Sequence, residues 1–143
     1  MKRIACVYFV FASALAAAQV PAGFSQLDVP ATVSVKQEIA ATPPNWQAGR
    51  DAARPELKGV TVFDGAPSEE AALVPDREVK AGAYAVWTFD PKGKRLIWVQ
   101  AQFAGTAITL AQALPAGTKE LRVYFDKGAS VDGARPIKRV VYR

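Results

Sequence analysis

Four acidic side chains lie close together in the sequence and are the residues with the clearest potential for chemistry. They are Asp64, Glu69, Glu70 and Asp76. Two carboxyl groups that face each other across a sugar, at roughly 5 Å or 6.5 to 9.5 Å, can hydrolyse a glycosidic bond. A carboxylate-dependent hydrolase of cell-wall glycan is therefore one alternative. The favoured interpretation is a solvated acidic loop, because the same segment carries the turn-forming residues Gly65 and Pro75.

Most other catalytic chemistry is excluded by composition. The chain contains no histidine, which rules out Ser-His-Asp and Cys-His nucleophile arrangements. Its single cysteine is Cys6, so a zinc site built on cysteine and histidine is excluded as well. No P-loop, dinucleotide-binding glycine fingerprint or EF-hand loop occurs, and no motif singles out a Ser-Lys dyad. We therefore expect no catalytic residue, no metal site and no cofactor.

Residues 1–18 have the three parts of a secretory signal peptide. A positively charged start is followed by an apolar run over Ile4–Leu15 and by small residues suited to cleavage. Beyond them, no apolar run approaches the roughly 20 residues that a transmembrane helix needs. We therefore expect a periplasmic or secreted protein that is not integral to the membrane, with one β-rich domain in residues 19–143.

The charge of the processed chain argues against nucleic acid as a partner. The full sequence has 18 basic and 13 acidic side chains, and cleavage removes two of the basic ones. The remaining excess is too small and too dispersed for a nucleic-acid-binding stripe. A C-terminal basic cluster is interpreted as charge that guards an edge strand, with contact to an anionic surface as the alternative. Its members are Arg135, Lys138, Arg139 and Arg143.

Alternation of apolar and polar residues predicts β-strands along most of the processed chain. The predicted strands are Ala31–Ile39, Leu57–Phe63, two arms within Ala83–Phe103, then Ala107–Leu114, Glu120–Asp126 and Ile137–Arg143. One helical turn is expected at Glu69–Val74. The connections are too short for crossover helices, so neighbouring strands should pair antiparallel. The expected fold is mainly β, a single-domain antiparallel meander sheet with little helix, with curling toward a barrel as a further option.

The segment Ala83–Phe103 is predicted to be a hairpin. Its arms meet at Asp90-Pro91-Lys92-Gly93, where proline in second and glycine in fourth place suit a type I turn. Counting back from the turn sets Trp87 opposite Ile97 and Ala85 opposite Val99. One face of the hairpin is then almost wholly apolar, and we expect it to form the core.

Aromatic residues outside this core indicate a binding function. Tyr84 and Trp98 lie on the half-polar face of the hairpin, which is too aromatic to be left bare without a reason. Trp46 stands in a proline-containing loop that we expect it to pin to the body. Aromatic anchors ringed by polar residues dominate interface energetics. The predicted binding residues are Trp46, Tyr84, Trp98, Glu69 and Glu70.

These residues predict a non-enzymatic binding or interaction module for an envelope protein, peptide or glycan. An inhibitor of a hydrolase, which blocks an active site with a rigid loop, is an alternative that rests on fold-level analogy. A structural envelope component without a specific ligand is another. The aromatic residues also have a structural explanation, in which the loop around Trp46 packs over Tyr84 and Trp98 as a second small core.

A set of residues spread over most of the processed chain resembles a known family. The set comprises Val60–Gly65, Pro67, Glu69, Glu70, Leu73–Asp76, Trp87, Phe89, Trp98, Gly105, Thr106, Leu114 and Pro115. This pattern is similar to that of small, uncharacterised exported proteins of Gram-negative bacteria. The resemblance implies a compartment and a β-rich fold, and it implies no activity.

This chain departs from the family pattern at four positions. The pattern has cysteines where this chain has Val29, Ala101, Leu121 and Tyr142. The resemblance implies that two disulfide bonds of relatives are replaced here by apolar side chains. Such a replacement would lose about 2 to 5 kcal/mol per bond, which added apolar burial offsets in part. We therefore expect these four positions to lie in or near the core.

Overall fold

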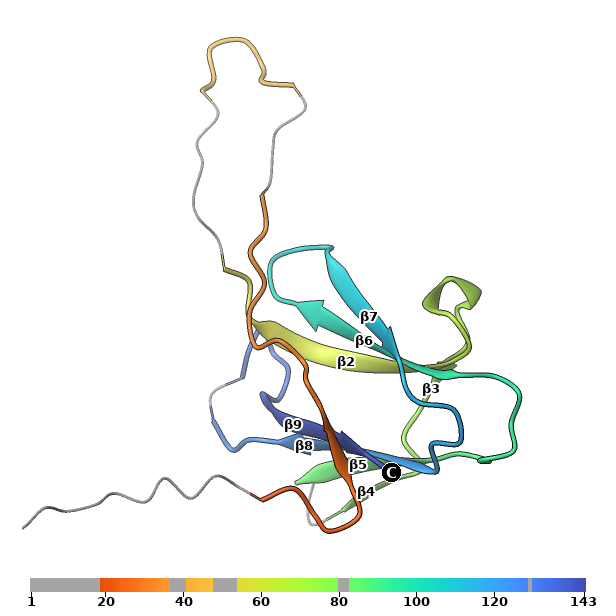
Figure 1. Cartoon of the computed structure of the whole chain (residues 1–143). Helices are drawn as coiled ribbons and strands as arrows, with labels where there is room; N and C mark the ends of the chain where they lie inside the picture. The colour runs from red at the N-terminus through yellow and green to blue at the C-terminus, as the bar shows by residue number, and fades with distance from the viewer. Residues whose placement is uncertain (1–18, 37–40, 48–53, 80–82, 129) are drawn as a thin grey trace, which may run out of the picture.

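The computed structural model describes residues 19–36, 41–47, 54–79, 83–128 and 130–143, which form two antiparallel β-sheets packed face to face (Figure 1). In spatial order, the five-stranded sheet contains β1 (Ser25–Leu27), β9 (Ile137–Tyr142), β8 (Glu120–Phe125), β5 (Tyr84–Thr88) and β4 (Arg77–Val79). The four-stranded sheet contains β3 (Ala72–Leu73), β2 (Leu57–Asp64), β6 (Ile97–Phe103) and β7 (Thr109–Ala113). A single 3-10 turn, η1 (Pro67–Glu69), is the helix found within the described residues. The prediction of a mainly β, antiparallel fold with little helix is confirmed. The helical turn expected at Glu69–Val74 is wrong, because η1 ends at Glu69 and Ala72–Leu73 form strand β3.

The core lies between the two sheets and is closed by alternate residues of their inner faces. The four-stranded sheet contributes Val62 and Val99, and the five-stranded sheet contributes Leu121, Val123 and Val140, all nearly or fully buried. Alternation follows from the strand period of two, which turns every second side chain inward. Each such side chain stabilises the fold by about 1.5 to 3 kcal/mol through burial.

Trp87 joins the two sheets as well as filling the space between them. Its ring packs in the core, and its indole N–H donates a hydrogen bond of 3.2 Å to the carbonyl of Leu73 in β3. A buried indole usually finds such a partner, because an unsatisfied donor is costly in an apolar interior.

The strands of the predicted hairpin belong to different sheets, which corrects that prediction. The turn itself is present, since the Gly93 N–H donates to the Asp90 carbonyl at 3.0 Å. Yet β5 pairs with β4 and β8, so that Trp87 lies opposite Leu121 rather than Ile97, and β6 pairs with β2 and β7. The segment between β5 and β6 is long enough to cross the roughly 10 Å between packed sheets. The chain therefore forms a two-sheet sandwich rather than one continuous meander.

The predicted inward face survives this change of partners. Ala85, Trp87, Val99, Ala101 and Phe103 are all buried, as the alternation requires. The parity of a strand decides which side chains face the core, and it does so whichever strand lies alongside. The faces were therefore predictable where the neighbours were not.

Two further expectations about strands are corrected. The predicted strand Ala31–Ile39 is reduced, within its described part, to an isolated bridge between Thr32 and Glu56, and residues 37–40 lie outside the described residues. The C-terminal basic cluster lies on β9 and directly beside it, but β9 is not an edge, because it lies between β1 and β8. Its arginines instead cover aromatic rings, as with Arg139 over Tyr124 at 4.4 Å and Arg135 over Phe125 at 4.1 Å.

The four positions at which the family pattern has cysteines lie in pairs. Leu121 is fully buried and stands directly opposite Tyr142 across β8 and β9. Val29 packs against the cluster of buried residues that contains Ala101. Because Glu120 and Arg143 exchange both backbone hydrogen bonds, the adjacent Leu121–Tyr142 pair is of the non-hydrogen-bonded kind, in which side chains approach more closely. That spacing suits a disulfide bond.

We expect a double variant, Leu121→Cys with Tyr142→Cys, to form a disulfide bond on oxidation. The oxidised form should be more stable than the reduced form of the same variant by about 2 to 4 kcal/mol. Thiol titration and urea unfolding of the two forms measure this, and the comparison removes the cost of losing Leu121 itself. Thiols that stay reactive under oxidising conditions in the folded protein would contradict the register.

Candidate functional site

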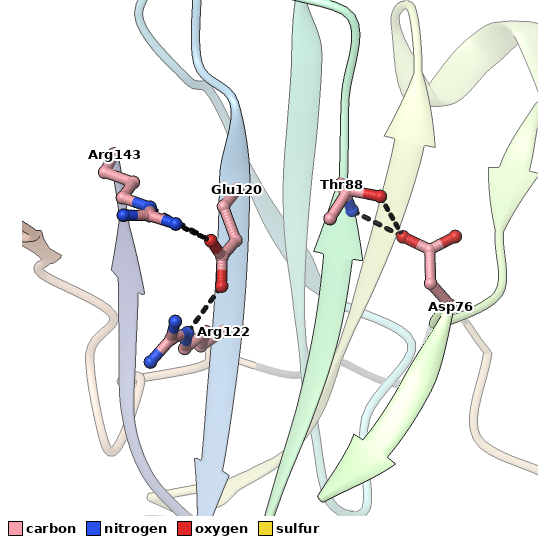
Figure 2. Close-up of polar contacts among 5 residues, drawn as sticks. All are labelled: Asp76, Thr88, Glu120, Arg122 and Arg143. Carbon is pink, nitrogen blue, oxygen red and sulfur yellow. Dashed lines mark hydrogen bonds and ion pairs between the residues drawn. The ribbon is translucent and has the colours of Figure 1, made fainter.

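A buried carboxylate, Glu120, organises the outer face of the five-stranded sheet. Its side chain is 7% exposed and accepts hydrogen bonds from Arg122 Nε at 2.6 Å and from Arg143 Nε at 2.9 Å (Figure 2). These three residues lie on one face of β8 and on the chain end that follows β9. Burial by itself raises the pKa of Glu120, but the hydrogen bonds from Arg122 and Arg143 outweigh it and hold the pKa below the ordinary value. Glu120 is therefore ionised at neutral pH.

Aromatic rings extend this cluster over the same face. The Phe24 ring lies beneath both guanidinium groups, 4.4 Å from Arg122 Cζ and 4.9 Å from Arg143 Cζ. Tyr84 stacks on Tyr124 with ring centroids 4.8 Å apart. Cation–π contacts of this kind hold a partly exposed arginine in place. The single Glu120 carboxylate is paired with both guanidinium groups, so the cluster fixes the outer face of this sheet.

The predicted binding residues are distributed over both faces of the sandwich. Tyr84 lies on the outer face of the five-stranded sheet, while Trp98 is half-buried on the outer face of the four-stranded sheet, opposite Phe63. Glu69 and Glu70 lie in the loop between β2 and β3. Because the two outer faces point in opposite directions, Tyr84 and Trp98 cannot belong to one contact surface.

Trp46 does not pack against the body, contrary to the expectation that it pins its loop there. Its side chain is 75% exposed, and Figure 1 shows the segment 41–47 well away from both sheets. The Trp46 N–H donates to the Pro43 carbonyl at 3.2 Å, and Asn45 between them has a φ of 70°. Proline in second place and a left-handed third residue define a type II turn. This turn presents the indole to solvent, so it forms no second core with Tyr84 and Trp98.

The grouped carboxylates are held by a shared arginine. Arg95 makes an ion pair with Glu69 and lies 3.5 Å from Asp64 through its Nε. Glu69 also accepts a hydrogen bond from the Ala66 N–H at 3.2 Å, which closes the η1 turn. Arg95 lies against Gly65, whose φ of 100° and lack of a Cβ leave room for the guanidinium. A cation therefore occupies the space between the two carboxylates.

Asp76 lies in the connection between β3 and β4, directly before β4, and is held by a different partner from Asp64 and Glu69. One of its carboxylate oxygens accepts hydrogen bonds of 2.6 Å from both the hydroxyl and the N–H of Thr88 (Figure 2). The hydroxyl bond first, and the backbone bond next, lower the pKa of Asp76. Asp64, Glu69 and Asp76 are thus engaged in fixing loops, and the geometry does not favour a glycan hydrolase.

A groove of about 360 Å³ lies at the end of the sandwich and is lined in part by Asp64 and Arg95. Most of its wall residues, Phe89 and Arg95 among them, come from the segment between β5 and β6 and from the β7–β8 turn, and the strands add Asp64 of β2 and Ile97 of β6. Within the described part of the chain, no group of three or more His, Cys, Asp or Glu side chains is placed to hold a metal ion. None of the described helices is long and apolar enough to cross a membrane.

Sequence reasoning missed the Glu120 cluster entirely. Its members are far apart in the chain, from Phe24 to Arg143. The available signal was the alternation in Glu120–Phe125, which sets Glu120, Arg122 and Tyr124 on one face of a strand. Three polar or aromatic residues on the outer face of a strand flanked by buried neighbours indicate a covered polar layer.

The fold defines a small β-sandwich protein. A family model described as Type VI secretion system Tli immunity protein matches residues 52–138, more than half of the chain. The chain belongs to this family of small bacterial proteins. Neither a curated protein nor a solved structure matches the chain.

The matched residues include all strands from β2 to β8 and the start of β9. Trp46 lies outside them, so membership in the family says nothing about this residue. The match supports the resemblance seen in the sequence to the extent that both indicate a family of small bacterial proteins, and the export of this member stays a prediction.

Proposed function

We propose that the protein is an exported immunity protein, which binds a toxic effector delivered by a type VI secretion system and neutralises it in the periplasm. The family match over residues 52–138 carries this proposal. The apolar run and charged start of residues 1–18 support export, and export would bring the protein to the compartment that such an effector enters. The proposal unites two classes considered from the sequence, an interaction module and an inhibitor.

Neutralisation by binding requires a rigid body with exposed anchors, and the described residues supply both. The sandwich fixes the loops at its ends through buried contacts and ion pairs, such as Arg95 with Asp64. The Trp46 indole is the largest exposed aromatic group among the described residues. Tryptophan is enriched among residues that dominate binding energy, because it buries a large area with few rotatable bonds. We therefore assign Trp46 as the main anchor and Glu70, which is exposed, as a contact at the sandwich end.

A competition assay between sibling strains tests this function. The gene for this protein is deleted, and the deletion strain is grown in contact with its parent, whose type VI system is active. We expect the parent to kill the deletion strain, because the strain lacks the matching immunity. A parent with an inactive secretion system should not kill it, and the full gene supplied on a plasmid should restore survival.

The same assay locates the site of action and identifies the partner. A version that lacks residues 2–18 should not protect, because it stays in the cytoplasm. Deleting effector genes from the attacking parent one at a time reveals the effector whose loss ends the killing. Equal survival of the deletion strain against active and inactive parents, at full expression of the secretion system, would contradict the proposed function.

A further inference from the structure

Strand β7 forms an edge of the four-stranded sheet whose backbone is open on one side. The Leu114 N–H donates to the Ile97 carbonyl at 2.7 Å, which marks these opposed residues as a hydrogen-bonded pair. In an antiparallel ladder such pairs alternate, so Gln112 and Leu110 also bond to β6. Thr109, Ala111 and Ala113 then direct their N–H and C=O groups away from β6. No strand lies on that side among the residues that the structure describes.

The edge at β7 differs from the other three sheet edges of the described chain. Strands β1, β3 and β4 have three residues or fewer, and β4 carries the charges of Arg77 and Glu78. Strand β7 has five residues and no charge. It lies in a stretch between Arg95 and Lys119 that contains no charged residue at all. Proteins usually shorten or charge an exposed edge to prevent pairing with another chain, and β7 has neither protection.

An apolar groove runs beside this edge. It has a volume of about 140 Å³ and lies between the end of β1 and the inner side of β7. Its lining includes Leu27, Val29, Val99, Ala101 and Leu110, and Leu110 is 43% exposed. A strand added to β7 would place every second side chain toward this groove and the others toward solvent. The edge therefore provides main-chain hydrogen bonds to an added strand, and the groove determines which side chains of that strand fit.

We propose that β7 binds an extended, uncharged strand of the effector, with apolar side chains at alternate positions that enter the groove. This inference rests on the proposed function and adds the mode of recognition, strand addition at a sheet edge. The partner strand should be uncharged over its paired length, because residues 96–118, which contain β7, carry no charged side chain. The one charged residue among the described residues of the groove lining is Asp28, which disfavours an acidic side chain there.

A second copy of this chain fits the edge less well than an effector strand does. Two β7 strands paired about a two-fold axis near Ala111 would bring their grooves together at the axis. Asp28 is one of the residues that line the groove, so this pairing would bring an Asp28 residue from each copy toward the same junction. Like charges that face each other disfavour the pairing.

Two variants test the proposal, each with the full gene in the sibling competition assay. Ala111→Pro removes an N–H that points to the open side while keeping the ladder to β6, a position at which proline is tolerated. Leu110→Lys places a charge in the groove. Ala111→Val is the matched control, because it keeps the N–H and favours the strand. Thermal unfolding and molar mass in solution are measured for each purified variant.

We expect Ala111→Pro and Leu110→Lys to keep the melting temperature of the native protein and to bind the identified effector about tenfold or more weakly, with loss of protection. The control should protect fully. If either variant fails to fold, the other decides. Full protection by a folded Ala111→Pro or Leu110→Lys variant would overturn the inference and leave the proposed function standing. A dimer that Ala111→Pro converts to a monomer would assign the edge to self-association, and failure of the native gene to protect would remove the proposed function as well.

Discussion

Replacement of Trp46 by alanine is expected to weaken effector binding by about 30- to 1000-fold, which corresponds to roughly 2 to 4 kcal/mol for a central aromatic anchor. The stability of the protein should not change, because the side chain is 75% exposed and lies on a turn away from both sheets. Surface substitutions of this kind usually alter the free energy of unfolding by less than about 0.5 kcal/mol. Isothermal titration with the effector gives the first quantity, and urea unfolding gives the second.

The matched control for this prediction is Trp98→Ala. Trp98 is half-buried opposite Phe63 on the outer face of β6, so its removal should lower stability by about 1 to 3 kcal/mol. Binding measured under folding conditions should change little if Trp46 is the anchor. The opposite pattern, with binding lost in the folded Trp98 variant and retained in the Trp46 variant, would move the interface to the outer face of the four-stranded sheet.

Replacement of Glu120 by alanine is expected to destabilise the protein by about 3 kcal/mol. The substitution leaves Arg122 and Arg143 without their shared carboxylate, and Arg122 is mostly covered. The expected loss in free energy of unfolding lies at the lower end of the range for a broken buried ion pair, because Arg143 is half-exposed and water screens its charge. Urea unfolding of the two proteins at neutral pH measures the difference.

The pH dependence of the stability difference between the native and Glu120→Ala proteins shows whether the charge of Glu120 causes it. The pKa of Glu120 is lower in the folded protein than its ordinary value of 4.5, so the folded state favours the ionised form. The stability from Glu120 is then fully present above about pH 4.5 and is lost as the pH falls through the folded pKa. The gap between native and Glu120→Ala proteins should therefore narrow in acid. Asp76 also has a lowered pKa, but it is present in both proteins and cancels.

A small effect would contradict the role of Glu120 as the organising carboxylate. A difference below about 1 kcal/mol at neutral pH would be typical of an exposed ion pair. Glu120→Gln serves as a second comparison, since it keeps the shape and one acceptor oxygen but removes the charge and turns the other oxygen into an NH2 donor that faces a guanidinium. Equal stability of the Gln variant and the native protein would assign the effect to packing.

The sequence predicted local features of the fold well and the arrangement of strands poorly. The strands near Leu57–Phe63, Ala107–Leu114, Glu120–Asp126 and Ile137–Arg143 are all present, because alternation reports directly on which residues face the core. The Asp90–Gly93 turn is also present. Alternation carries no information about which strand lies alongside, so β5 and β6 were paired with each other although they belong to opposite sheets.

The candidate site was harder to predict than the fold. The expected burial of Trp46 depended on a pocket that the body does not provide, and the structure instead shows an exposed indole. The ion pair of Arg95 with Asp64 and Glu69 depends on the approach of the loop before β6 to the loop after β2. Long-range contacts of this kind are set by the packing of the sheets, which local patterns do not contain.

The most direct test of the immunity function is a titration of the purified, processed protein with the effector that the competition assay identifies. We predict a one-to-one complex with a Kd well below 1 µM, corresponding to a binding free energy beyond about −8 kcal/mol, and loss of the activity of the effector in the same mixture. Absence of a complex between the folded protein and the active effector, in a strain background where the gene protects, would contradict neutralisation by binding.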